Sequence, residues 1–124
     1  MIAEAIVCLA LNTYHEAKNQ SRIGQVAVAE VVMNRVKDKR YPNNVCDVVK
    51  QGLTYKWKPS LPIKNKCQFS WYCDGKSDKA REKQAWNNAL TVAKGVYYGY
   101  LTAHLQGATH YHAHYVRPSW AETK

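Results

Sequence analysis

The sequence lacks a hydrophobic run long enough to cross a bilayer. The longest, Ala5 to Leu11, is far shorter than the roughly 20 residues that a membrane helix needs. Proline and glycine are scarce, at 4 and 6 residues, while 46% of the chain is hydrophobic, which excludes collagen-like and disordered proteins. The 124 residues suffice for one hydrophobic core and not for two. We therefore expect a single domain over residues 1–124 and no membrane insertion.

Acidic residues and phenylalanine are also few. Nine acids stand against 18 lysines and arginines, and the resulting net charge of +9 attracts nucleic acid, anionic lipid or an anionic bacterial envelope. Phe69 is the single phenylalanine, whereas there are 4 tryptophans and 9 tyrosines, whose polar tips suit wet clefts that bind sugars or bases. The composition favours a polyanionic partner without identifying it.

The four cysteines include no Cys-x-x-Cys pair, so we expect no four-thiolate zinc site. Cys8 lies in the first apolar run and is interpreted as a small core residue. If the segment from Cys67 to Cys73 is extended, its ends lie about 20 Å apart, beyond the about 7 Å that a disulfide spans. We therefore predict that any disulfide joins Cys46 to Cys67 or Cys73.

Apolar residues at helical spacing predict four helices. The first covers residues 2–17, and the second begins after Ser21 as N-cap and runs through Val36. Asn43 is expected to cap a short third helix, and Asp78 a fourth that ends at Gly99.

The remaining segments indicate loops and strands. Residues 53–66 contain lysines and prolines but no acid, which is typical of an exposed basic loop. Residues 67–73 and 108–116 alternate in polarity like strands. Together with the helices, these strands predict an α+β fold in which about four helices pack against a small antiparallel sheet.

The second of these strands places His110, His112 and His114 on one face. Imidazoles at this spacing can share a metal ion, but no further ligand has a recognisable spacing. We expect histidines that form hydrogen bonds in a cleft, and no metal or cofactor.

Glu16 is the strongest candidate for acid catalysis. It ends an apolar helix, where partial burial would raise the pKa of its carboxyl and let it donate a proton near neutral pH. The alternative is an ordinary surface acid at a helix end. Glu30 shares the polar face of the second helix with Asn34 and Lys37, and we interpret it as a surface residue.

Several motifs occur in a familiar order: ALNTYHEAKNQSRIGQVAVAEVVMNRV, YPNNVCDVVKQ, CQFSWYCDGK, AWNNAL and GATHYHAHYVRPSWA. In this order the chain resembles the cell-wall hydrolase family of SleB-type spore-cortex-lytic enzymes and their phage and proteobacterial relatives. The resemblance implies a lysozyme-like domain that cuts peptidoglycan between N-acetylmuramic acid and N-acetylglucosamine as a lytic transglycosylase. It also implies that Glu16, in the Tyr-x-Glu-Ala box, is the catalytic acid.

The resemblance and the chemistry together suggest residues for the glycan cleft. The family's box usually continues Ala-Arg-Gly-Glu, but this chain has Gln20 in place of the second acid, and Gln20 can only position substrate by hydrogen bonding. Arg35 and Trp120 are interpreted either as cleft residues or as structural ones. The expected substrate-binding set comprises Gln20, Gln25, Ser70, Trp71, His110, Tyr111 and His112.

The amino terminus has no signal-peptide pattern, so we expect synthesis in the host cytoplasm and action on the cell wall after the membrane is breached, as in a phage endolysin. The expected partner is the glycan strand, and the expected state is a monomer. Two alternatives are kept: a metal-dependent peptidoglycan amidase, which the histidines favour, and a basic nucleic-acid-binding module. Because no nucleic-acid-binding motif is present, we do not expect a nucleic-acid partner.

Overall fold

The computed structural model describes residues 2–55, 58–67, 69–73 and 80–109; for residues 52–55, 58–67, 70 and 73 it describes the backbone alone. Its elements in chain order are α1 (Ile2–Ala17), α2 (Arg22–Lys37), α3 (Val45–Val49), β1 (Gly52–Tyr55), β2 (Lys58–Cys67), the 3-10 helix η1 (Ser70–Cys73) and α4 (Lys83–Tyr97).

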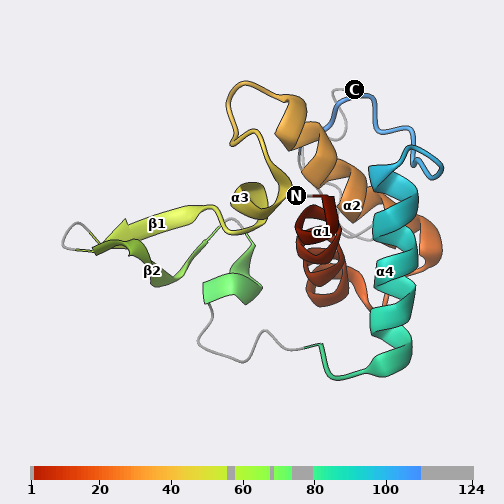
Figure 1. The fold of residues 1–124 in the computed structure, drawn as a ribbon, viewed down its shortest axis with the longest axis horizontal. Helices are drawn as coiled ribbons and strands as arrows, with labels where there is room; N and C mark the ends of the chain where they lie inside the picture. Colours follow the sequence, from red (N-terminus) through yellow and green to blue (C-terminus); the bar gives the residue numbers. More distant parts are fainter. Residues whose placement is uncertain (1, 56–57, 68, 74–79, 110–124) are drawn as a thin grey trace, which may run out of the picture.

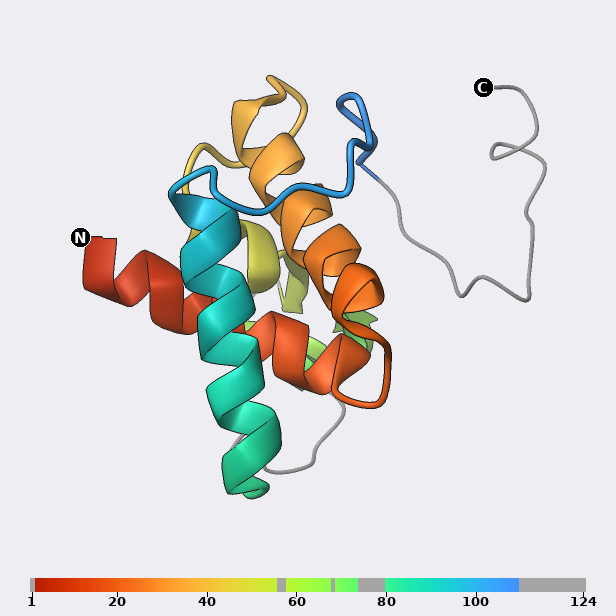
Figure 2. The same cartoon turned by 90° about the vertical axis from the view of Figure 1, so that its right-hand side faces the viewer.

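The core is formed by helices packed on helices. α1 contacts α2, α3 and α4, and α2 contacts α3 and α4, so α1 and α2 each touch all the other helices of the bundle (Figures 1 and 2). Leu9, Val32, Val48 and Val92, one from each helix, are completely buried where these helices meet. Each helix therefore folds by burying one apolar stripe against its neighbours, and α3 and α4 share α1 and α2 as those neighbours.

The helix ends follow local sequence signals. Ser21 caps α2 as predicted, because its hydroxyl accepts a hydrogen bond from the Gly24 N–H at 3.4 Å. α3 is capped by Asn44 and not by the predicted Asn43, and the predicted Asp78 cap is also wrong, because α4 begins at Lys83 with Glu82 in the N-cap position. Gly99, with φ of 83°, ends the last turn after α4 as predicted, since this left-handed conformation favours glycine.

The predicted α+β class is wrong. Four helices are present, but they pack on each other, and no sheet underlies them in the described residues. The described strands, β1 and β2, form an antiparallel ribbon that extends away from the helices (Figure 1), and the ribbon's main contacts are with η1. A two-stranded ribbon has too little surface to serve as a layer of the core.

The strands also lie in other segments than predicted. The ribbon comes from residues 52–67, where a loop was expected; prolines are tolerated because both strands are edges of the sheet. The predicted strand from Cys67 to Cys73 is wrong, since Cys67 ends β2 and residues 70–73 form η1. Of the predicted strand over residues 108–116, all but the first two residues lie outside the described part.

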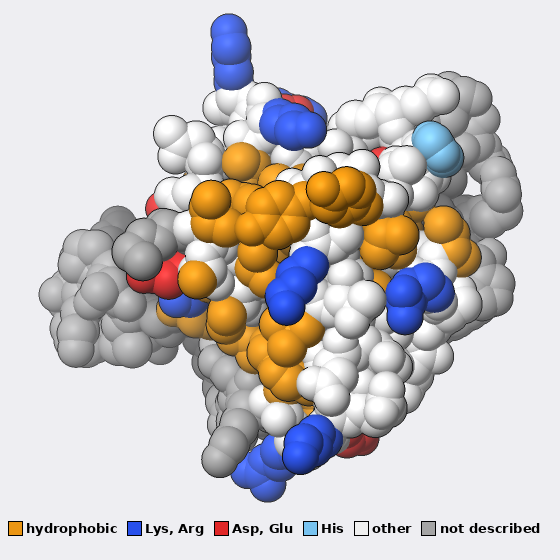
Figure 3. Space-filling view, turned by 45° about the vertical axis from the view of Figure 1, so that its right-hand side comes forward, with side chains coloured by type: hydrophobic (Ala, Val, Ile, Leu, Met, Phe, Trp, Pro, Cys, Tyr) orange, Lys and Arg blue, Asp and Glu red, His pale blue; other side chains and the backbone are white. Residues whose placement is uncertain are grey.

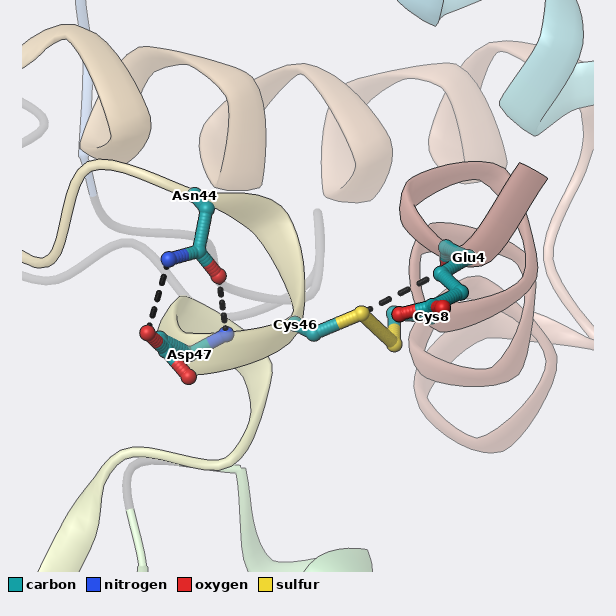
Figure 4. Close-up of a disulfide and its surroundings, with 5 residues drawn as sticks. All are labelled: Glu4, Cys8, Asn44, Cys46 and Asp47. Carbon is teal, nitrogen blue, oxygen red and sulfur yellow. Dashed lines mark hydrogen bonds between the residues drawn. A yellow bond between two sulfur atoms is a disulfide. The ribbon is translucent and has the colours of Figure 1, made fainter. Parts of the chain in front are cut away.

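The predicted disulfide pairing is also wrong. Cys46 bonds to Cys8, with the two Cα atoms 5.2 Å apart (Figure 4). Both side chains lie where α3 packs against α1. Cys8 does occupy the core position predicted for it, and this position is next to Cys46. The bond joins residues separated by 38 positions, and a loop of that length corresponds to about 4 kcal/mol of stabilisation through the unfolded chain.

Among the described residues, no helix is long and apolar enough to cross a membrane.

Candidate active site around Glu16

Glu16 lies in the last turn of α1, with its side chain half-buried. Burial is the largest influence on its carboxyl and raises the pKa above its ordinary value. The positive charges of His15 and Arg35 oppose this shift without reversing it. A carboxyl whose pKa is raised stays protonated to higher pH, which is the property that a general acid needs.

His15 and Trp71 form an aromatic layer beside Glu16. The two rings stack with centroids 4.8 Å apart and planes at 16°. The Trp71 N–H donates a 2.7 Å hydrogen bond to Oδ1 of Asn12, which is completely buried. Trp71 is only 8% exposed, so its ring supports His15 from the inside, while His15 remains half-buried at the surface of this layer.

Gln20 and Gln25 are brought together at the turn between α1 and α2. Gln25 donates a hydrogen bond from Nε2 to the Gln20 carbonyl at 3.4 Å. The Gln20 side chain lies against Gly24, where an added Cβ would come within 3.0 Å of the Gln20 Cβ. Gln25 is 6% exposed, and its Oε1 accepts no hydrogen bond from the described residues.

Arg35 is the buried cation of the site. Its guanidinium carbon lies 4.9 Å from the Phe69 ring centre and 5.1 Å from that of Tyr41. Its Nε donates a 2.7 Å hydrogen bond to the Thr109 carbonyl, and its Nη1 finds no acceptor among the described residues. The sequence left open whether Arg35 is a cleft residue or a structural one; the structure buries it within electrostatic range of Glu16.

A second polar cluster on α2 holds the segment from residue 101 to 109, which we call the α4 tail. The Glu30 carboxylate accepts hydrogen bonds from the Ala103 and Leu105 N–H groups, at 2.7 and 2.8 Å, and from the Thr102 hydroxyl at 2.8 Å. One turn further along α2, Asn34 donates to the Ala108 carbonyl at 3.0 Å. These bonds fix a tail in which His104 and Gln106 adopt left-handed conformations.

Glu30 therefore has the opposite electrostatic character to Glu16. Partial burial alone would raise its pKa, but the N–H groups of Leu105 and Ala103, the Thr102 hydroxyl and the charge of His104 together outweigh burial and lower the pKa. The interpretation of Glu30 as a surface residue missed this role.

Four of the predicted site residues cannot be compared fully with the structure. Ser70 begins η1, but its side chain is not described, and His110, Tyr111 and His112 lie outside the described residues, as does Trp120. In the described part of the chain, no three potential ligands are grouped around a metal-sized space.

The residues that sequence reasoning missed are Asn12 and His15 in the aromatic layer and Glu30 in the tail cluster. Asn12 had one signal, since a polar residue in the middle of an apolar helix requires a buried partner. Glu30 had none, because its partners lie 72 to 75 positions away in the sequence.

Parts of this sequence are similar to known proteins. A 50-residue stretch, 40% of this chain, is 38% identical to the spore cortex-lytic enzyme of Halalkalibacterium halodurans and covers 15% of that protein. No solved structure matches significantly. The profile of the cell wall hydrolase family matches residues 19–124, beginning three positions after Glu16. Because this match covers most of the sequence, the chain belongs to the cell wall hydrolase family.

Proposed function

We propose that this chain degrades peptidoglycan as a lytic transglycosylase, cutting between N-acetylmuramic acid and N-acetylglucosamine with Glu16 as the catalytic residue. The observation that carries the proposal is the half-buried Glu16 carboxyl, whose pKa burial raises. Family membership supports peptidoglycan as the substrate.

A single carboxyl suffices for this reaction. Protonated Glu16 gives its proton to the glycosidic oxygen as the bond from C1 breaks, and the bonding electron pair leaves with that oxygen. The Glu16 carboxylate then takes the proton of the muramic C6 hydroxyl. In the same step the C6 oxygen bonds to C1 and closes an anhydro ring. No water is consumed, and Glu16 is protonated again.

The environment of Glu16 favours this route over hydrolysis with two carboxylates. Within the described residues, the groups whose charges act on Glu16 are His15 and Arg35, and neither is a carboxyl group. Gln20 stands where relatives usually carry a second acid, and it lies against Gly24 at the next turn. Gln20 and Gln25 are proposed to bind the glycan beside the His15 and Trp71 layer.

We also propose that the protein acts on the wall outside the cytoplasm, as an endolysin does. The disulfide between Cys8 and Cys46 supports this, because such bonds persist in oxidising compartments. The net charge of +9 would draw the protein to an anionic wall, and lysines and arginines are scattered across the face in Figure 3 instead of forming one nucleic-acid-binding patch.

Mass spectrometry of the fragments released from purified peptidoglycan tests the proposal. We expect glycan ends that carry anhydromuramic acid, with the same yield in a chelator. Reducing muramic ends would indicate a hydrolase of the lysozyme type. Free stem peptides, with activity lost in chelator and restored by zinc, would indicate the amidase.

A further inference from the structure

We propose that Arg35 is a positioning residue for the reaction. It binds the Thr109 carbonyl through Nε, and its Nη1, which has no acceptor among the described residues, stabilises Glu16 once that side chain has given up its proton. This inference rests on the proposed role of Glu16 and adds a second residue to it.

The burial of Arg35 is the first argument. Arg35 is only 5% exposed as a residue, and a charge removed from water in this way is costly unless it is compensated. The rings of Phe69 and Tyr41 compensate part of this cost through their π faces, at 4.9 and 5.1 Å. In the described part of the chain, no carboxylate forms an ion pair with Arg35.

The unused donor is the second argument. Nη1 is buried and has no hydrogen-bond acceptor among the described residues, although Nε of the same group is bonded to Thr109. Buried donors without partners are rare in folded proteins and often occur where function requires them. An acceptor that is present in only one stage of the reaction would account for this one.

The position of Glu16 is the third argument. Besides the Tyr41 phenol, Glu16 is the acidic group whose charge acts on Arg35, and it is the one carboxyl described that does so; Arg35 acts on Glu16 in return. Ionised Glu16 has two oxygens that can accept hydrogen bonds, whereas protonated Glu16 has less need of one. Arg35 would therefore favour the carboxylate that forms after proton transfer, and so make Glu16 a stronger acid.

Arg35 also holds Thr109 in place. Its carbonyl is held at 2.7 Å by the Arg35 Nε, and Asn34 holds the preceding carbonyl, that of Ala108. His110 follows Thr109 directly in the chain. Arg35 thus links the acid on α1 to the start of the histidine segment that sequence analysis assigned to the glycan cleft.

The test compares Arg35→Gln with Arg40→Gln, which removes the same charge from an exposed residue that also faces Tyr41. For Arg35→Gln we expect kcat to fall at least tenfold while KM stays within about twofold. Loss of the positive charge raises the pKa of Glu16, so the descending limb of the kcat profile should move to higher pH by at least about half a unit. His15, the other charged group described at Glu16, is the same in both variants. Arg40→Gln should match the wild type.

An unshifted pH limb, or a rise in KM at constant kcat, would overturn the inference. If Arg35→Gln lacks a cooperative melting transition, Arg35→Lys is measured in its place. This variant keeps the positive charge but loses the forked donors of the guanidinium. We expect its kcat to fall at least fivefold while the descending pH limb stays near its wild-type position. Wild-type kcat in a folded Arg35→Lys variant would equally contradict it. Glu16→Gln is measured alongside to separate the two proposals. An active Glu16→Gln variant contradicts the proposed function itself. An inactive Glu16→Gln variant, together with an unaltered pH profile of kcat for Arg35→Gln, contradicts the Arg35 role alone.

Discussion

Glu16 and Glu30 are two partly buried glutamates on adjacent helices, and their surroundings differ. Glu30 accepts three hydrogen bonds from the α4 tail, and its pKa is lowered. Glu16 accepts none from the described residues, and burial raises its pKa. A carboxylate with all its partners in place holds structure together, whereas a carboxyl buried without them is ready to exchange a proton.

The same contrast extends to the neighbours of each glutamate. Next to Glu30 on α2, Asn34 is bonded to the tail. Around the end of α1, Asn12, Gln25 and Arg35 each retain one buried polar atom that lacks a partner in the described part of the chain. Unpaired buried polar atoms reduce stability, so these three indicate a region that is not built for stability alone, although Arg35 also holds the α4 tail through the Thr109 carbonyl.

Replacing Glu16 should produce the largest effect. Glu16→Gln removes the proton donor but keeps the shape of the side chain, so we expect lysis of a wall suspension to slow at least about a hundredfold. Its melting temperature at pH 7 should equal or slightly exceed that of the wild type, because a carboxylate that burial disfavours is gone. Glu82→Gln, which changes an exposed acid at the N-cap position just before α4, is the control and should lyse at the wild-type rate. A folded Glu16→Gln variant with near-normal lysis would remove Glu16 from the mechanism.

Replacing Glu30 should instead affect stability. Glu30→Gln keeps one acceptor but loses the charge that strengthens three hydrogen bonds, and we expect a loss of about 1 to 2 kcal/mol in the free energy of unfolding. Thermal melting should show a decrease of about 4 to 8 °C. Glu82→Gln again serves as the matched control, since its ion pair with Lys18 is exposed and contributes little. Equal melting temperatures for both variants would mean that the tail does not depend on Glu30.

Acid should abolish that stability difference. The pKa of Glu30 is lower in the folded chain than in the unfolded one, so its contribution is present above the unfolded pKa of about 4.3 and is lost as the pH falls through the folded value. The gap in melting temperature between wild type and Glu30→Gln should therefore narrow steadily below about pH 4. A gap that stays constant down to pH 2 would show that the charge of Glu30 is irrelevant.

Local patterns predicted the helices, because helical periodicity and the Ser21 cap are encoded within a few neighbouring residues; the catalytic role of Glu16 stays a prediction. They failed for the ribbon, since β2 lacks regular alternation and contains prolines. They also failed for the cluster around Glu30 and for the contact between Trp71 and Asn12. Those contacts join residues 59 to 75 positions apart, and a single sequence carries no signal for such pairing.

The same reasoning explains the error over Cys8. Its apolar surroundings correctly indicated a core position, but a core position also brought it to α3, where Cys46 lies. The expected bond from Cys46 to Cys67 or Cys73 depended on a strand that the structure does not contain.

The most direct test of the contrast between the two glutamates is a carbon-13 NMR titration of the side-chain carboxyls in the wild-type protein, assigned with Glu16→Gln and Glu30→Gln. We predict that Glu16 titrates above the ordinary glutamate value and Glu30 below it, in the same sample. If the order is reversed, or if Glu16 titrates at or below the ordinary value, burial does not prepare Glu16 as an acid and its proposed role is contradicted.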